Sequence, residues 1–317
     1  MSIGSSRITR SRLLAGLCLA VTAAGCGSLP SEPGRDTAPP PAAAAAVANP
    51  AAAVLPGRAS EQEYHPVAEP RVRAAPLTGS ELTELARAWG LDAPPLPAPA
   101  PPAVKPELRE NGPHVQLSGD GLPARVRRVP TTDKVVFLTV DDGLEKDRRF
   151  NRMMRELGVP FSAFVSGYLA RSDYGYFREL NDQGVRVNNH TLDHKDLRRL
   201  DRQQQSRQIC GQQDELVREV GPRPVLFRPP YGEFNADTLR AAKDCGITAM
   251  PLWNEEAFPD RMEYRHLDQR LHPGDIILTH FRGAGQWGGS MTDLARLVIR
   301  TATEQGFALA RLDDYLG

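Results

Sequence analysis

Short apolar runs alternate with amphipathic segments from about residue 130 to the C-terminus. The runs are rich in β-branched and aromatic residues, and between them apolar residues recur at helical spacing, for example over 203–220 and 291–303. This alternation is typical of strand–helix repeats around a mainly parallel sheet. It predicts one α/β domain, a distorted (β/α) barrel of about seven strands. The predicted strands are 135–140, 161–165, 185–188, 225–227, 247–250, 276–279 and 307–310.

The N-terminus has the layout of a secretory signal. Arginines precede an apolar run over 13–24, and small residues lead up to Cys26. The run is too short to span a bilayer. Residues 1–25 are therefore predicted to be a signal peptide, and the Ala-Ala-Gly-Cys sequence that ends at Cys26 resembles a bacterial lipobox. We expect an exported protein, either anchored to the outer face of the membrane through lipid on Cys26 or secreted after cleavage.

Residues 26–128 differ in composition from the rest of the chain. Of the 28 prolines, 19 fall between Pro30 and Pro123, with few large apolar residues among them. Such a segment cannot offset the entropy cost of ordering, which predicts a Pro/Ala-rich disordered tether before a folded domain over 129–317. Within the tether, residues 80–90 combine a capping serine, helical apolar spacing and a final glycine. They are interpreted as a docking helix or as a transient one.

Charge and cysteine content restrict the partners and the compartment. Lys+Arg and Asp+Glu both number 39, and no basic run interleaves with aromatics, so nucleic acid is not an expected partner. Beyond Cys26, only Cys210 and Cys245 remain. In an exported domain they form a disulfide, or they are two small buried apolar side chains; the sequence leaves both open.

Chemically capable residues follow several predicted strands. In barrels, reactive groups lie at the C-terminal ends of strands, where this chain has Asp141-Asp142, His190 with His194, Arg228 and His280. Two histidines four apart plus one carboxylate make a three-ligand metal site with open positions. Adjacent aspartates at a strand end point differently, so one can bind metal while the other takes a proton. Each group also has a competing, non-catalytic interpretation. The pair His190 and His194 could lie on a helix surface, and Asp141-Asp142 could form a loop or helix N-cap. Arg228 could form a rim salt bridge, and His280 could be a hydrogen-bonded core residue.

These residues occur in four segments, and the segments resemble four of the five motifs of the polysaccharide deacetylases, carbohydrate esterase family 4, with its NodB homology domain. The segments are 139–143, 189–194, 227–232 and 278–280, in the family's order. The resemblance covers about 129 to the C-terminus and implies a role for each residue of the site. It implies that Asp141 is the catalytic base, that Arg228 orients it and that His280 is the general acid. It further implies that a divalent metal, Zn²⁺ foremost with Co²⁺ as an alternative, is bound by Asp142, His190 and His194. The Tyr231 N–H would donate to the oxyanion, and Leu278 would line the pocket for the acetyl methyl.

The fourth motif departs from the family's pattern. The family has an aspartate four residues before a tryptophan that tunes the acid histidine, and no such match surrounds Trp253. Glu255, Glu256 or Asp260 is the candidate carboxylate. The resemblance implies removal of N-acetyl groups from a GlcNAc-containing polysaccharide such as peptidoglycan or chitooligosaccharide. An O-acetyl esterase of the acetylxylan type and a non-catalytic sugar-binding envelope lipoprotein are the alternatives.

Overall fold

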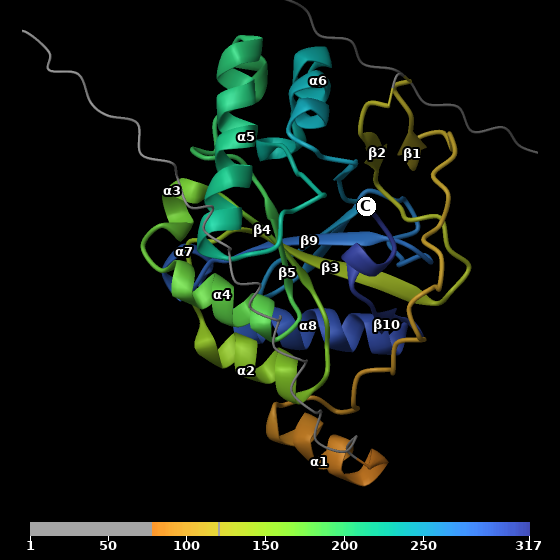
Figure 1. The fold of residues 1–317 in the computed structure, drawn as a ribbon. Helices are drawn as coiled ribbons and strands as arrows, with labels where there is room; N and C mark the ends of the chain where they lie inside the picture. Colours follow the sequence, from red (N-terminus) through yellow and green to blue (C-terminus); the bar gives the residue numbers. More distant parts are fainter. Residues whose placement is uncertain (1–77, 120) are drawn as a thin grey trace, which may run out of the picture. The chain divides into compact units, whose positions relative to one another are not determined.

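The computed structural model describes residues 78–119 and 121–317 (Figure 1). The predicted signal peptide, Cys26 and the tether up to residue 77 lie outside the described residues. Within the described part, no helix combines the length and the apolar character needed to cross a bilayer.

The central strand is β3 (Val135–Asp142), and all of its residues are buried. Val136, Leu138 and Val140 contribute to one hydrophobic core, whereas Val135 and Phe137 contribute to a second one on the other face. This division follows from the two-residue period of a strand, and it explains why the run is apolar throughout. The strand is therefore covered on both faces, as in other parallel α/β sheets.

The main sheet has seven strands in the order β5-β4-β3-β9-β7-β8, with β10 paired to the first residues of β3. Neighbours of β3 run parallel to it, and β7 and β8 form an antiparallel hairpin beyond β9. The other strands are β4 (Ser162–Val165), β5 (Arg186–Asn189), β7 (Glu255–Ala257), β8 (Met262–Tyr264), β9 (Ile276–His280) and β10 (Ala308–Leu309).

The predicted barrel does not close. Strands β1 (Val115–Gln116), β2 (Ala124–Val126) and β6 (Ala249–Pro251) form a separate three-stranded sheet. The predicted strand 225–227 makes only isolated bridges, Asn189 to Phe227 and Leu226 to Ala249. Prolines at 224, 229 and 230 flank this run and lack the N–H that a continuous ladder requires. The ladder is therefore interrupted where closure would have taken place.

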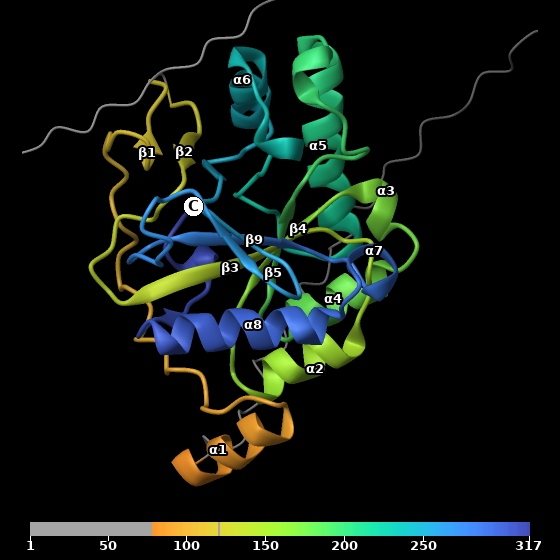
Figure 2. The ribbon, with the colours of Figure 1, turned by 180° about the vertical axis from the view of Figure 1, so that it is seen from behind.

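Helices cover the sheet on both sides. Figures 1 and 2 show α2 (Arg148–Glu156) and α8 (Met291–Glu304) on one side of β3 and β9, and α6 (Ala236–Asp244) with most of α5 (Arg202–Glu219) on the other. Their first turns are capped by side chains, as the sequence pattern favours. The remaining helices are α3 (Gly167–Ala170), α4 (Tyr174–Asp182), α7 (Ala284–Trp287) and the 3₁₀ segments η1 (Leu197–Arg199), η2 (Pro230–Gly232) and η3 (Leu312–Asp314).

Cys210 on α5 and Cys245 at the end of α6 form a disulfide with Cα atoms 5.0 Å apart. The two helices also pack directly against one another. Of the two interpretations of these cysteines, the structure shows the covalent one.

The described part of the predicted tether contains packed structure. Helix α1 (Gly79–Ala88) docks on the domain: Ala86, Trp89 and Leu91 are buried in the main core, and Trp89 Nε1 donates to Glu156 Oε2 at 2.8 Å. Strands β1 and β2 also lie before residue 129. The few large side chains of this segment are enough to order it, because they pack into the hydrophobic core that the domain supplies.

Candidate active site

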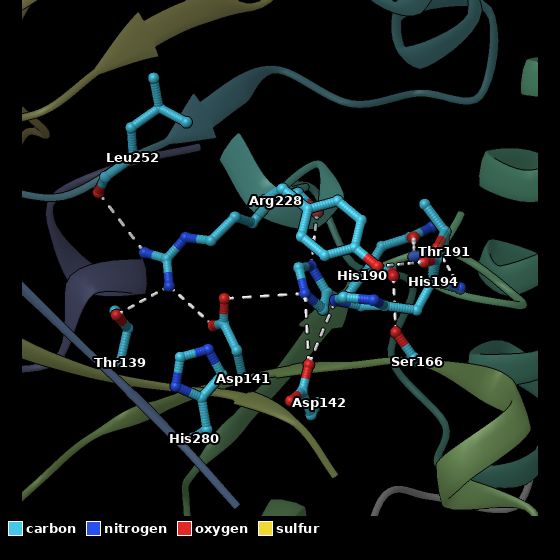
Figure 3. A network of polar contacts seen from close by, with 12 residues as sticks. Thr139, Asp141, Asp142, Ser166, His190, Thr191, His194, Arg228, Leu252 and His280 are labelled. Atoms are coloured by element: carbon cyan, nitrogen blue, oxygen red, sulfur yellow. Dashed lines mark hydrogen bonds and ion pairs between the residues drawn. The ribbon is translucent and has the colours of Figure 1, made fainter. Parts of the chain in front are cut away.

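The strand register brings the predicted site residues together at one edge of the sheet (Figure 3). Asp141 on β3 is paired with His280 on β9. Val165, the partner of Asp142 on β4, is paired in turn with Asn189, which directly precedes His190. Arg228 donates its backbone N–H to the Asn189 carbonyl at 3.0 Å. Parallel strands end at the same edge, so residues far apart in sequence meet there.

Arg228 and Asp141 form a fully buried ion pair. Arg228 Nη1 donates to Asp141 Oδ1 at 2.7 Å, and the side chains are 0% and 3% exposed. The guanidinium also donates to Thr139 Oγ1 and to the Pro251 carbonyl, each at 2.9 Å. Four donated bonds and a ring contact with Phe164 hold the arginine rigidly. It therefore fixes the direction in which Asp141 points.

Asp142, His190 and His194 form a group that fits a metal ion. Asp142 Oδ1 lies 3.3 Å from His194 Nε2 and 3.7 Å from His190 Nε2. This oxygen is buried and has no hydrogen-bond partner among the described residues. The set of two imidazoles and one carboxylate is that of catalytic zinc sites, so a divalent cation would satisfy the orphaned oxygen.

Second contacts orient these side chains. His190 Nδ1 lies 2.7 Å from the Arg228 carbonyl, which leaves Nε2 directed at Asp142. An imidazole that donates its other N–H to a carbonyl is typical of metal ligands. Ser166 Oγ donates to the His190 carbonyl at 2.7 Å, and Thr191 Oγ1 accepts from the His194 N–H at 3.1 Å.

Backbone strain concentrates at the same place. Among the described residues, five non-glycine residues have positive φ, and four of them belong to the site or its loops: Asp142 (77°), Thr191 (72°), His194 (52°) and Tyr231 (63°). Side chains other than Asn and Asp adopt this region at a cost, which native folds sustain mainly where function requires it. The strain supports a functional role for these loops.

Burial sets the protonation of the site. It raises the pKa of Asp141 to about 7, against the opposing charge of Arg228. Burial alone would raise the pKa of Asp142 too, but the imidazoles and the Arg282 guanidinium around it hold this pKa below the ordinary value. Burial lowers the pKa of both His190 and His194 to about 4. Both imidazoles are therefore neutral at pH 7, the form that binds metals.

His280 lies at the edge of this group with Glu256 as its nearest carboxylate. Glu256 Oε1 on the adjacent strand β7 is 3.9 Å from His280 Nδ1, and that nitrogen is buried without a hydrogen bond among the described residues. Burial lowers the pKa of His280 to about 4. Of the other candidates, Asp260 is exposed beside Arg261, and Glu255 is buried near Asp275.

The two predicted substrate residues frame the site. Leu278 is buried on β9, two residues before His280 and hence on the same face of the strand. The Tyr231 side chain is exposed, and its ring lies 4.8 Å from that of His194.

One contact of the site was not predicted from the sequence. Arg282 Nη2 donates to Asp142 Oδ2 at 3.0 Å, so the arginine touches a predicted metal ligand. Its place two residues beyond His280 was the available signal, because it puts the arginine just past the C-terminal end of β9, at the edge of the sheet where the site lies.

A second group of possible ligands, His266, His272 and Asp275, lies at the opposite end of β9. There Arg128 donates to Asp275 Oδ1 at 2.7 Å, and its Nη2 is 2.8 Å from His266 Nε2. A guanidinium thus already neutralises this carboxylate, so the group is a structural ion network.

Residues 128–250 match the family model described as polysaccharide deacetylase. The chain is 41% identical over 202 residues to an uncharacterised protein of Streptomyces coelicolor, covering 62% of this chain and 79% of that protein. It is 25% identical over 201 residues to the peptidoglycan-N-acetylmuramic acid deacetylase PdaA of Bacillus subtilis, covering 59% and 73%. A solved family 4 carbohydrate esterase pseudoenzyme of Bacillus anthracis superposes with a TM-score of 0.53 at 21% identity, covering 62% of this chain and 69% of that one.

The structural likeness, at this identity, concerns the fold. Together with the family match and the relatives, it places the chain plainly: it belongs to the polysaccharide deacetylase family, carbohydrate esterase family 4.

Proposed function

We propose that this protein is a metal-dependent hydrolase that removes N-acetyl groups from a GlcNAc-containing polysaccharide of the cell wall or cell exterior. The observation that carries the proposal is the position of Asp141, held by Arg228, beside the group Asp142, His190 and His194. A base with a pKa of about 7 next to a metal site is suited to activating water near neutral pH. That a relative bears the name of a peptidoglycan deacetylase supports the substrate class.

A divalent cation bound by Asp142, His190 and His194, Zn²⁺ foremost and Co²⁺ as an alternative, would polarise the acetamide carbonyl and acidify water. Asp141 accepts the proton of the attacking water, and Arg228 keeps the carboxylate aimed at it. The Tyr231 N–H donates to the oxyanion. When the C–N bond breaks, His280 protonates the nitrogen, so the products are acetate and a free amino sugar.

Glu256 takes the place of the missing fourth-motif aspartate in this scheme. Its carboxylate is the nearest to His280 Nδ1, at 3.9 Å. It would approach the ring when His280 becomes cationic, favouring the protonated form that the acid step requires. Leu278 would line the pocket for the acetyl methyl.

The location is a further part of the proposal. The signal-like residues 1–25 support export, and Cys26 supports a lipid anchor on the outer face of the membrane. Cell-wall glycans would be accessible from either an anchored or a secreted position.

Acetate release tests the proposal. The purified protein should release acetate from peptidoglycan or chitooligosaccharide, lose this activity with a chelator and recover it with Zn²⁺. Greater release from acetylxylan would favour the O-acetyl esterase. Bound metal and sugar without acetate release from any of the three would favour the non-catalytic binding protein.

The role of His280 can be tested separately. His280→Ala should lower turnover of an N-acetyl sugar by about 10²–10⁴-fold, and of an activated acetate ester far less, because that leaving group needs no proton. His272→Ala, at the opposite end of β9, is the matched control. Equal losses on amide and ester would remove His280 from the acid role.

A further inference from the structure

Arg282 presents a partly exposed guanidinium at the edge of the site. Its Nη2 bonds to Asp142 Oδ2 at 3.0 Å, its side chain is 39% exposed, and it lies 5.7 Å from the centre of the Trp287 ring. Within 78–119 and 121–317, Asp142 is the only carboxylate with which it forms an ion pair. Among the same residues its Nε and Nη1 donors form no hydrogen bond or ion pair, so they are available to a ligand.

The other cations beside the site pair with carboxylates that are not predicted metal ligands, whereas the partner of Arg282 is one. A hollow of about 650 Å³ adjoins His194 and Tyr231 and is lined by several basic side chains. Each of these cations already has a carboxylate of its own nearby. The pairs are Lys195 with Asp193 at 3.5 Å, Arg198 with Glu233 at 2.7 Å, and Arg199 with Asp196 at 3.5 Å.

The charges of the site stay net positive once a divalent cation is bound, even though the Glu256 carboxylate lies near enough to Arg282 to interact with its charge. Asp141 is balanced by Arg228. Asp142 is then the single carboxylate that faces both the divalent cation and Arg282, while neutral imidazoles add no charge. Such a centre carries net positive charge in a partly desolvated setting, where an anionic group is strongly attracted.

We propose that Arg282 forms a subsite for a carboxylate on the sugar unit whose acetamide is cleaved. Guanidinium groups bind carboxylates through parallel N–H donors, a geometry that a neutral hydroxyl cannot match. The substrate class is therefore a glycan of N-acetylated amino sugars that carry an acidic substituent, and a neutral chitin-type chain is the poorer substrate. This inference rests on the proposed deacetylase function and narrows its substrate.

Matched substrates test the subsite. Peptide-free glycan strands that contain N-acetylmuramic acid are compared with the same strands after conversion of each carboxylate to a methylamide. The wild type should prefer the acidic strands by about 10- to 100-fold in kcat/KM. Arg282→Gln should reduce this ratio to near 1, whereas Arg282→Lys should retain part of it. Arg198→Gln, whose charge is balanced in the fold, is the control and should leave the ratio unchanged.

The ratio separates recognition from a general loss of activity, because any damage to the metal site affects both substrates. Calorimetric binding of the two strands to the Zn²⁺-loaded protein gives a second readout. The wild type should bind the acidic strands more tightly, and Arg282→Gln should bind both strands about equally. An unaltered preference in Arg282→Gln, or none in the wild type, would overturn the subsite. Absence of acetate release from every strand would instead contradict the proposed function, and binding would then decide the subsite alone.

Discussion

Replacing Arg228 by methionine tests whether the buried ion pair organises the site. Methionine keeps much of the apolar stem but removes the donors to Asp141, Thr139 and Pro251. Asp141, whose side chain is 3% exposed, then remains buried without its partner. Breaking a buried pair in this way destabilises a protein by about 3–5 kcal/mol. This is a large part of the roughly 5–15 kcal/mol that stabilises a typical domain.

The size of this loss should depend on pH. Burial raises the pKa of Asp141 to about 7, and Arg228 counteracts the rise. A carboxyl whose pKa is raised by folding stabilises the fold below its unfolded value, near 4, and this contribution is lost as the pH increases toward the folded value. Without Arg228 the folded pKa rises further, so the loss continues above pH 7. The difference between variant and wild type should grow there by up to about 1.4 kcal/mol per pH unit.

Urea unfolding of the metal-free protein at pH 5, 7 and 8, at constant ionic strength, measures both effects. Arg152→Met is the matched control, because Arg152 pairs with Glu156 at 2.9 Å but is 63% exposed. Its loss should cost less than about 1 kcal/mol at every pH. If Arg228→Met were no more destabilising than Arg152→Met, or if its effect did not change with pH, the account of the buried pair would be wrong.

Two further predictions concern other carboxylates. Loss of a residue that hydrogen-bonds to a metal ligand typically weakens metal binding by roughly 10–100-fold. Asp142→Asn should weaken Zn²⁺ binding by more than this, as measured by calorimetry. An unchanged Kd would exclude Asp142 as a ligand. Burial, together with Asp275, raises the pKa of Glu255 to about 9. The free energy of unfolding of the wild type should therefore fall by about 1.4 kcal/mol per pH unit between about pH 5 and 9. Glu255→Gln removes this titration, so the variant should become increasingly more stable than the wild type over that range. Parallel pH–stability curves for the two proteins would contradict this.

Much of the candidate site could be predicted because it lies where strands end. Asp141, Asp142, His190 and His280 each follow an apolar run, and the structure brings them together through the register of β3, β4, β5 and β9. The Arg228–Asp141 contact agrees with the orienting role that the resemblance implied. The functional roles themselves remain predictions that the experiments above address.

Closure of the barrel could not be predicted, because pairing depends on partners distant in sequence. The run 225–227 is as apolar as the other strands, yet it forms only isolated bridges between its flanking prolines. The β7–β8 hairpin was missed because its first strand begins with two glutamates, which hardly resemble a strand. There Glu255 is buried, whereas Glu256 turns toward His280.

The alternation of strands and helices and the residue types available for chemistry follow from the sequence alone, because periodicity and composition are local properties. Four features required the packed fold: Glu256 is the carboxylate nearest His280, Arg282 reaches Asp142, Cys210 is bonded to Cys245, and α1 docks through Trp89. Each of these depends on distances between atoms of different elements. Such distances arise only when the elements pack, since a long side chain can reach several partners until the core fixes its position.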